Sequence, residues 1–364
     1  MKILLFTDSL GAGGAQRQLV GLAVLLKKKG LEVKVCTYYD IDFYQQYLED
    51  NGIVNEIIPH AITFQKRIWA VRKYFKKENP NCVIAYQETP SLVACAAKML
   101  GCKFHLIASE RNTTQIISMN ERIRFFLYKW VDAIVPNSYA QEKFLLQHYP
   151  WMKVKIKTIT NFVDLDRFSY VKRVRHRVPL IVIVASIWES KNTLGLIEGL
   201  KLLKNRGINF KVSWYGISEK NSDYLAQCRS KIEEYDLQDY IELCKKTKVI
   251  EKKYAEADYF CLPSFFEGTP NVICEAISTG LPIICSDVCD NSIYVKDGIN
   301  GFLFDPHHPE SIAISLSKAL ALNDEQYRLF CMNSRQNAET LLNSDDFVDK
   351  YIKQYCVKLT FNRL

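Results

Sequence analysis

An alternation of short apolar runs with longer segments of helical periodicity limits the fold of this chain more than any other feature. In the first half the apolar runs are residues 3–7, 31–37, 53–58, 82–86, 104–108 and 132–136. The segment 15–29 has apolar residues at helical spacing, and Gly30 ends it. Strands that alternate with helices form a parallel sheet covered on both faces. The first half therefore predicts a doubly wound α/β domain.

The alternation begins again after a polar, basic segment at residues 161–178, which we interpret as a linker. The apolar runs of the second half are residues 180–185, 210–215, 240–244, 259–262, 282–285 and 301–304. A chain of 364 residues suits two domains that each bury a core. We expect one domain over residues 1–165 and another over 166–345, with a C-terminal helix at about 346–364 that packs back onto the first. Two such domains in series place a ligand in the cleft between them, at the carboxyl ends of the strands.

The net charge of +8 belongs to the first half. Residues 1–170 contain 23 Lys and Arg against 15 Asp and Glu, whereas the remainder contains 25 of each. Such an excess attracts an anionic partner. A lipid headgroup surface, a diphosphate-bearing acceptor and nucleic acid all qualify, but no recognition motif supports nucleic acid, and we expect none.

Two segments that mix cations with aromatic residues, 66–77 and 122–130, allow two interpretations. They are helices that lie on an anionic lipid surface, or they are helices whose aromatics cover the sheet while their lysines stay solvated. Both interpretations remain open for each segment, and we expect that at least one of the two touches a membrane.

The sequence shows no leader peptide and no stretch near the ~18 uncharged apolar residues of a membrane span. We interpret the protein as soluble and cytoplasmic, acting at the inner face of the membrane. Its twelve cysteines are scattered without a CxxC pair, and Cys285 and Cys289 lack a second pair of ligands nearby. The six histidines form no cluster either. We therefore expect reduced thiols, no bound metal and no cofactor.

The strongest motif is the segment 264–276, which follows a buried strand and opens a helix. Thr269 suits the cap of that helix and Pro270 its first position. Backbone N–H groups and the dipole at a helix start favour a diphosphate. Glu267 then lies beside the phosphate pocket and Glu275 further along the helix. Two such acceptors can bind hydroxyls on two rings joined by a diphosphate.

This motif, with the segments 278–283 and 297–301, resembles glycosyltransferase family 4. The segments 161–164 and 167–168 are similar to the interdomain segment of that family, and Asn137-Ser138 and the glycine loop 11–16 also match it. The resemblance covers nearly the whole chain. It implies a GT-B fold, in which two Rossmann-like doubly wound domains face each other across a cleft, the first binding acceptor and the second binding a nucleotide sugar. It also implies sugar transfer with retention, most commonly from a UDP-sugar.

The resemblance also assigns roles to single residues. Glu275 would bind the ribose, Glu267 would face the donor sugar, and Lys191 would contact the diphosphate, where a cation offsets charge on the leaving nucleotide. Lys245 lies where the family contacts the base. The donor sugar and phosphates would be held by the loop Gly268, Thr269, Pro270, Asn271 and Val272. The acceptor or phosphate loop would be Gly13, Gly14 and Gln16.

Two positions depart from the family pattern. Ser186 stands where many members have an arginine on the diphosphate, so leaving-group stabilisation would depend on Lys191, the helix start or another cation such as Arg111. Many members also have a histidine near the reacting carbon, where this chain reads Ser109-Glu110-Arg111. Glu110 is our candidate for that place. The catalytic candidates are thus Glu267, Lys191 and Glu110, with Ser186 and Arg111 counted among the donor contacts.

The glycine loop alone also suggests a dehydrogenase, but Gln16 follows it where a dinucleotide fingerprint has its third glycine. Two alternatives share the GT-B architecture: a nucleotide-sugar epimerase, and a non-catalytic binding protein, which Ser186 keeps open. The glycine loop offers no general base and Asp8 is its only acidic neighbour, so we expect retention. The prediction is transfer from a UDP-sugar to a lipid-linked or surface-polysaccharide acceptor.

Overall fold

The computed structural model describes residues 1–59, 63–217, 222–247 and 249–353. They group into two compact units, residues 1–161 with the segment from Ser344 onward, and residues 162–343. The domain boundary that we predict from the sequence lies between residues 165 and 166, and the predicted C-terminal helix spans about 346–364. The helix described there is α14 (Ser344–Tyr351), and the rest of that prediction, from residue 354, lies outside the described residues.

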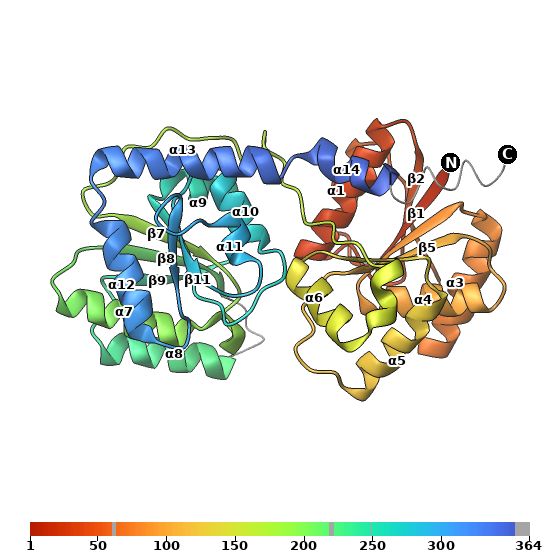
Figure 1. Ribbon diagram of the computed structural model, residues 1–364, viewed down its shortest axis with the longest axis horizontal. Coiled ribbons are helices and arrows are strands. Elements are labelled where there is room, and N and C mark those ends of the chain that lie inside the picture. The colour runs from red at the N-terminus through yellow and green to blue at the C-terminus, as the bar shows by residue number, and fades with distance from the viewer. Residues whose placement is uncertain (60–62, 218–221, 248, 354–364) are drawn as a thin grey trace. The chain divides into compact units, whose positions relative to one another are not determined.

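The first unit is built on a parallel sheet with the strand order β3-β2-β1-β4-β5-β6. Figure 1 labels β1, β2 and β5 of this sheet. Its strands are β1 (Lys2–Phe6), β2 (Glu32–Thr37), β3 (Asn55–Ile57), β4 (Cys82–Tyr86), β5 (His105–Glu110) and β6 (Ala133–Pro136). The helices are α1 (Gly14–Lys28), α2 (Gln45–Asp50), α3 (Phe64–Glu78), α4 (Glu88–Met99), α5 (Met119–Leu127), α6 (Tyr139–His148) and α14. Two 3-10 turns, η1 (Tyr128–Trp130) and η2 (Pro150–Val154), complete this unit.

The second unit has the strand order β12-β11-β10-β7-β8-β9, again all parallel. Its strands are β7 (Leu180–Val184), β8 (Lys211–Ile217), β9 (Ile241–Lys245), β10 (Tyr259–Leu262), β11 (Ile283–Ser286) and β12 (Gly301–Phe304). Its helices are α7 (Thr193–Asn205), α8 (Ser222–Glu234), α9 (Ile250–Glu256), α10 (Asn271–Ser278), α11 (Asn291–Tyr294), α12 (Pro309–Leu320) and α13 (Asp324–Leu341), with the short turn η3 (Glu189–Lys191).

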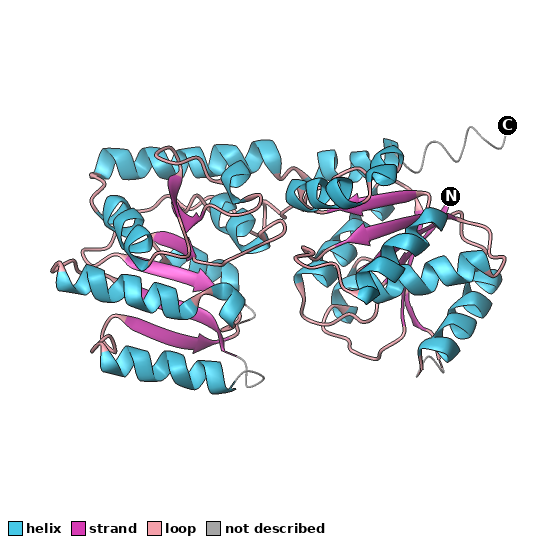
Figure 2. Ribbon diagram, turned by 60° about the horizontal axis from the view of Figure 1, so that its bottom comes forward, coloured by secondary structure: helices cyan, strands magenta, loops and turns pink. Residues whose placement is uncertain are grey.

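Each sheet is buried on both faces, as Figure 2 shows by the helices on either side of the strands. All five residues of β4 are buried. In β1, Leu4 and Phe6 belong to the core shared with α3 and α4, while α1 packs against β2 and β4. A central strand buried on both faces has to be apolar throughout, as β4 is, whereas the edge strands β3 and β9 are partly exposed and contain Glu56 and Glu242. Each of the twelve strands overlaps one of the twelve apolar runs of the sequence. The predicted doubly wound α/β architecture is confirmed.

Three further sequence predictions can be compared with the structure. The segment expected to be a linker contains no helix or strand between η2 and β7. The cysteines in the described residues are free thiols, and most of them are buried. The start of α10 differs from the prediction, because the helix begins at Asn271 and Pro270 takes the cap position without a side-chain cap hydrogen bond. Pro270 has ψ 89°, outside the helical range, so the chain turns into the helix one residue later than expected.

Two kinds of feature are absent from the described residues. No helix there combines the length and the apolar character that crossing a membrane requires. Nor does that part of the chain bring three His, Cys, Asp or Glu side chains together in a way that could hold a metal ion.

Candidate active site

The loops that follow β7 and β10 carry Lys191 and Glu267, two of the predicted catalytic residues. The Lys191 ammonium donates to Glu267 Oε1 at 2.5 Å, and the Ser264 hydroxyl donates to the same oxygen at 2.6 Å. The Phe265 N–H donates to the Ser190 carbonyl at 3.0 Å, which joins the two loops through their backbones. The structure therefore brings together Lys191 and Glu267, which lie 76 residues apart in the sequence.

Lys191 ends the short turn η3, and its neighbour Asn192 fixes where that turn stops. Asn192 has a left-handed backbone with φ 54°, and its side chain donates to the Pro306 carbonyl at 2.7 Å. Asparagine tolerates this conformation better than most residues do. The turn thus ends at a buried, hydrogen-bonded residue, while the Lys191 side chain keeps 26% of its surface exposed.

Glu275 lies on α10 with only 3% of its surface exposed. The Tyr254 hydroxyl donates to Glu275 Oε2 at 3.1 Å. Tyr254 is itself fully buried on α9 and packs edge-on against Phe260. A buried carboxylate needs such a donor, because removing its charge from water costs free energy that hydrogen bonds have to offset. Sequence reasoning missed Tyr254, since nothing in the sequence links a tyrosine of α9 to a glutamate of α10.

A close backbone approach holds the loop that contains Ser186. A Cβ atom at Gly216 would lie 1.9 Å from the Ala185 carbonyl oxygen, and Gly216 has φ +155°. The Trp214 indole N–H donates to that same carbonyl at 2.7 Å. Only glycine fits where β8 passes this close to the loop after β7. Gly216 and Trp214 are thus supports of the Ser186 loop that the sequence alone did not reveal.

The remaining predicted donor contacts lie at the rim of the same sheet. Gly268, Asn271 and Val272 are partly exposed, whereas Thr269 and Pro270 are buried. Lys245 is the last residue of β9 and is exposed. All of them follow the carboxyl end of a strand or begin a helix, which is where parallel sheets bind ligands.

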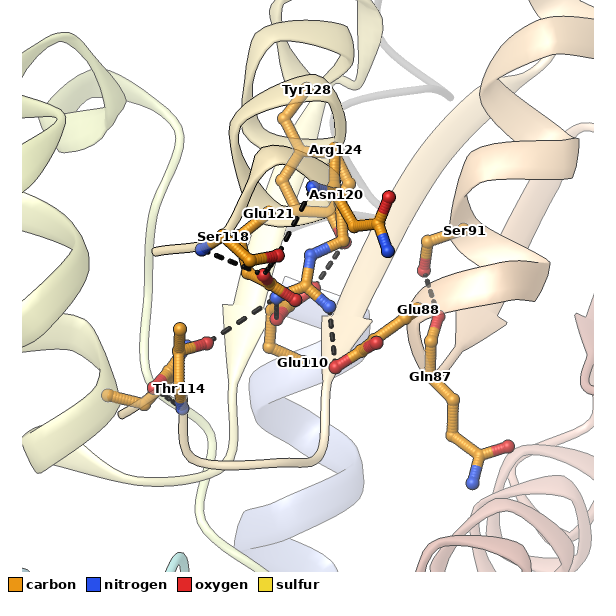
Figure 3. Close-up of polar contacts among 11 residues, drawn as sticks. Gln87, Glu88, Ser91, Glu110, Thr114, Ser118, Asn120, Glu121, Arg124 and Tyr128 are labelled. Carbon is orange, nitrogen blue, oxygen red and sulfur yellow. Dashed lines mark hydrogen bonds and ion pairs between the residues drawn. The ribbon is translucent and has the colours of Figure 1, made fainter. Parts of the chain in front are cut away.

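Glu110, at the end of β5, lies inside a buried polar network of the first unit (Figure 3). The Tyr128 hydroxyl donates to Glu110 Oε1, and an Arg124 guanidinium nitrogen lies 3.5 Å from Oε2. Arg124 also pairs with Glu88 at 2.6 Å. Burial raises the pKa of the Glu110 carboxyl above its usual value, and the Arg124 charge opposes this shift. The network ties α5 to the end of β5 and the start of α4.

Arg111 uses its whole guanidinium within the first unit. It donates to the Ser109 hydroxyl at 2.8 Å, to Asn161 Oδ1 at 3.0 Å and to the Tyr351 hydroxyl at 2.7 Å. Its charged carbon lies 4.2 Å from the centre of the Tyr86 ring. These contacts attach α14 and the end of the first unit to β5. The predicted roles of Glu110 in catalysis and of Arg111 in donor binding stay predictions.

The glycine loop precedes α1. A Cβ atom at Gly13 would lie 2.3 Å from Gln16 Oε1, so Gly13 leaves the space into which the Gln16 side chain folds. Gln16 is buried, and its amide donates to Asp8 Oδ1 at 3.2 Å. Gly14 is the first residue of α1. The loop predicted for acceptor or phosphate is therefore organised around Gln16 and Asp8.

Two family models match the chain. The model described as "Glycosyl transferases group 1" matches residues 166–337, and the model described as "Glycosyltransferase Family 4" matches residues 12–167. The chain belongs to the group 1 glycosyltransferases of family 4.

Named relatives agree with this assignment. A Campylobacter jejuni α-1,4-N-acetyl-D-galactosaminyltransferase that acts on a diphosphoundecaprenol-linked glycan is 23% identical over 99% of this chain and 98% of its own length. An Escherichia coli enzyme named UDP-Gal:alpha-D-GlcNAc-diphosphoundecaprenol alpha-1,3-galactosyltransferase is 24% identical over 82% of this chain and 80% of its own. The structure of Anabaena HepE in complex with UDP-glucose superposes on this chain with a TM-score of 0.86 at 17% sequence identity. The comparison covers 100% of both chains. The fold of this glycosyltransferase is GT-B.

In this glycosyltransferase the loops predicted to bind the donor place opposite charges together. A carboxylate and an ammonium at 2.5 Å neutralise each other, and both lie beside the start of α10. A lysine so placed can stabilise negative charge that develops on a leaving phosphate, because fixed cations act strongly where water is partly excluded. Lys191 and Glu267 are therefore the candidate reacting-centre residues of this glycosyltransferase.

Proposed function

We propose that this enzyme transfers a sugar, with retention, from a UDP-sugar to a lipid-linked diphosphate glycan during surface-polysaccharide assembly. The observation that carries the proposal is the Lys191–Glu267 pair at the start of α10, with the buried Glu275 further along the same helix. The relatives named above, which act on diphosphoundecaprenol-linked acceptors, and the UDP-glucose complex of HepE support the choice of substrates.

In the proposed reaction an acceptor hydroxyl attacks the anomeric carbon from the face that the UDP leaves. The bond between this carbon and the β-phosphate oxygen breaks, and the departing phosphate takes the hydroxyl proton. Lys191 stabilises the charge on that phosphate, and Glu275 binds the ribose. A basic side chain across the sugar is not required in this route, which fits a glycine loop that has only Asp8 as an acidic neighbour.

A membrane surface is the proposed place of action, at the cytoplasmic face. The outward side of α5 and its flanks is apolar: Met119, Ile123 and Phe126 are 68%, 52% and 53% exposed. Ile116 and Trp130 extend this row, and Arg122 and Lys129 stand beside it. We call Ile116, Met119, Ile123, Phe126 and Trp130 the α5 stripe. An apolar row with cations beside it is typical of a helix that lies in an anionic lipid interface.

Product analysis tests the reaction. The purified protein is incubated with UDP-glucose, UDP-galactose, UDP-GlcNAc or UDP-GalNAc, with undecaprenyl diphosphate bearing one N-acetylhexosamine as the acceptor and GDP-mannose as the control donor. We expect UDP release that depends on the acceptor, and an α-linked product by the anomeric proton coupling.

Other outcomes of this experiment identify the alternatives. A β-linked product would reject retention. An epimerised sugar nucleotide without acceptor would indicate an epimerase, and UDP binding by calorimetry without any turnover would indicate a binding protein.

A further inference from the structure

Gln87, the residue after β4, has a backbone conformation that side chains rarely adopt. Its φ is 73° and its ψ is 175°, a region that is essentially confined to glycine. The conformation is held from both sides. The Gln87 N–H donates to the Ser109 carbonyl at 3.1 Å, and its own carbonyl accepts from the Ser91 N–H at 3.2 Å and from the Ser91 hydroxyl at 2.6 Å (Figure 3). The fold therefore keeps a strained glutamine where glycine would be relaxed.

This strained backbone decides where the Gln87 side chain goes. In Figure 3 the side chain points away from the network of Glu110 and Arg124. Its Oε1 atom lies 3.4 Å from the Thr7 hydroxyl and 3.5 Å from the Gln16 amide nitrogen. The carboxamide is thus directed to the end of β1 and the glycine loop, although the neighbouring residue Glu88 turns toward Arg124.

The place reached by this side chain is the switch point of the sheet. β1 lies between β2 and β4, so the chain leaves β1 toward one edge of the sheet and later returns to its other side. Open α/β sheets bind ligands at this point, outside the carboxyl ends of the two central strands. Gln87 follows β4 directly and Thr7 follows β1 directly.

Five polar residues meet here, and we call them the switch-point cluster: Thr7, Asp8, Ser9, Gln16 and Gln87. Their mutual hydrogen bonds are long, between 3.2 and 3.5 Å. In the described part of the chain, the side-chain donors to the Asp8 carboxylate are Thr7, Ser9 and Gln16, all of them uncharged. The Asp8 carboxylate accepts these three long hydrogen bonds at Oδ1, and Gln87 Oε1 accepts two, from Thr7 and Gln16. A carboxylate and a carboxamide oxygen with such long hydrogen bonds suit a hydroxyl group as a further donor.

We propose that Asp8 and Gln87 bind a hydroxyl group of the acceptor sugar, and that the strain at Gln87 is maintained for this contact. The inference rests on the proposed sugar transfer and adds the residues that hold the acceptor. Strain that the surrounding hydrogen bonds sustain is typical of ligand-binding positions. A stabilising change at such a position is then expected to weaken function.

The test is to replace Gln87 by glycine, which relieves the strain and removes the carboxamide together. We expect Gln87→Gly to raise Tm by about 2 to 4 °C. We also expect it to raise KM for the undecaprenyl diphosphate acceptor roughly 3- to 10-fold, as the loss of a hydrogen bond does. KM for the UDP-sugar and the affinity for UDP should not change. Asp8→Asn should raise the acceptor KM further, since it removes a charged acceptor.

Asn79 offers a matched control. It has φ 44° and stands at the end of α3, just before β4, whereas Gln87 stands just after β4. Asn79→Gly also replaces a residue of positive φ, but Asn79 lies at the opposite end of β4 from Gln87. The acceptor KM of this variant should therefore stay at the wild-type value.

Two results would overturn the inference. One is a wild-type acceptor KM in Gln87→Gly, and the other is a lower Tm accompanied by equal losses for donor and acceptor, which would make Gln87 a structural residue. Absence of transfer by the unaltered enzyme with every donor would instead remove the proposed function, on which the inference depends.

Discussion

Lys191 and Glu267 are ordinary surface residue types, and their positions make them candidates for a shared function. Alone, each would be a solvated charge, and an exposed pair between them would add little stability. Here they lie 2.5 Å apart beside the start of α10, with side chains only 26% and 13% exposed. A diphosphate beside Glu267 would be repelled if Lys191 were absent.

We therefore predict that Lys191→Ala lowers kcat by about 100-fold or more, as loss of a group that stabilises developing charge does. Lys253→Ala is the matched control, because Lys253 also forms an ion pair in the second unit, with Glu256 at 2.7 Å. Steady-state kinetics at saturating UDP-sugar measure both variants. A normal kcat for Lys191→Ala would show that the lysine is at most a binding contact.

At the scale of the element, α5 has two different faces. Its inner face carries Arg124 and Phe125, which are buried, and Arg124 ties the helix to Glu88 and Glu110. Its outer face belongs to the α5 stripe. The exposed Ile123 and Phe126 depart from the usual pattern of a surface helix, and the proposed contact with a lipid surface would account for them.

We predict that the double variant Ile123→Asp/Phe126→Ser weakens binding to anionic vesicles at least about tenfold, since each side chain contributes on the order of 1.5 to 3 kcal/mol when buried. The control is Leu329→Ser/Met332→Ser on α13, where both residues are similarly exposed. Sedimentation with phosphatidylglycerol vesicles measures binding, and UDP affinity checks the fold. Equal losses in both variants would argue against the α5 stripe.

At the scale of the whole molecule, charge is divided unequally. Residues 1–170 hold the entire excess of +8, while the remainder is balanced. We therefore expect an anionic surface to attract this basic first half of the chain. Electrostatic attraction acts over a long range and is weakened by salt, whereas the apolar contact proposed for the α5 stripe acts only at short range. The salt dependence of binding therefore distinguishes the two contributions.

We predict that raising the salt concentration from 0.05 to 0.5 M weakens vesicle binding of the unaltered protein, because exposed charges are screened beyond roughly 10 Å at 0.1 M. Neutral phosphatidylcholine vesicles should bind less at low salt. Co-sedimentation at both salt concentrations measures this. Equal binding to neutral and anionic vesicles would leave no role for the basic first half.

The sequence by itself determined the doubly wound architecture and marked the loops that we predict to bind the donor. Central strands buried on both faces must be apolar throughout, and each of the twelve strands overlaps one of the twelve apolar runs. The segment around Glu267 and Glu275 was also local enough to be recognised, because a strand, a loop and a helix follow one another within a few residues.

Only the tertiary structure decided which side chains meet across long separations. Arg111 reaches Tyr351, which is 240 residues away, and Tyr254 reaches Glu275 from another helix. Glu110 was a catalytic candidate by sequence, and folding surrounded it with Arg124 and Tyr128. The left-handed backbone of Gln87 has no sequence signal at all. A strand on one side and a helix on the other impose it, because their hydrogen bonds together outweigh the preference of the residue itself.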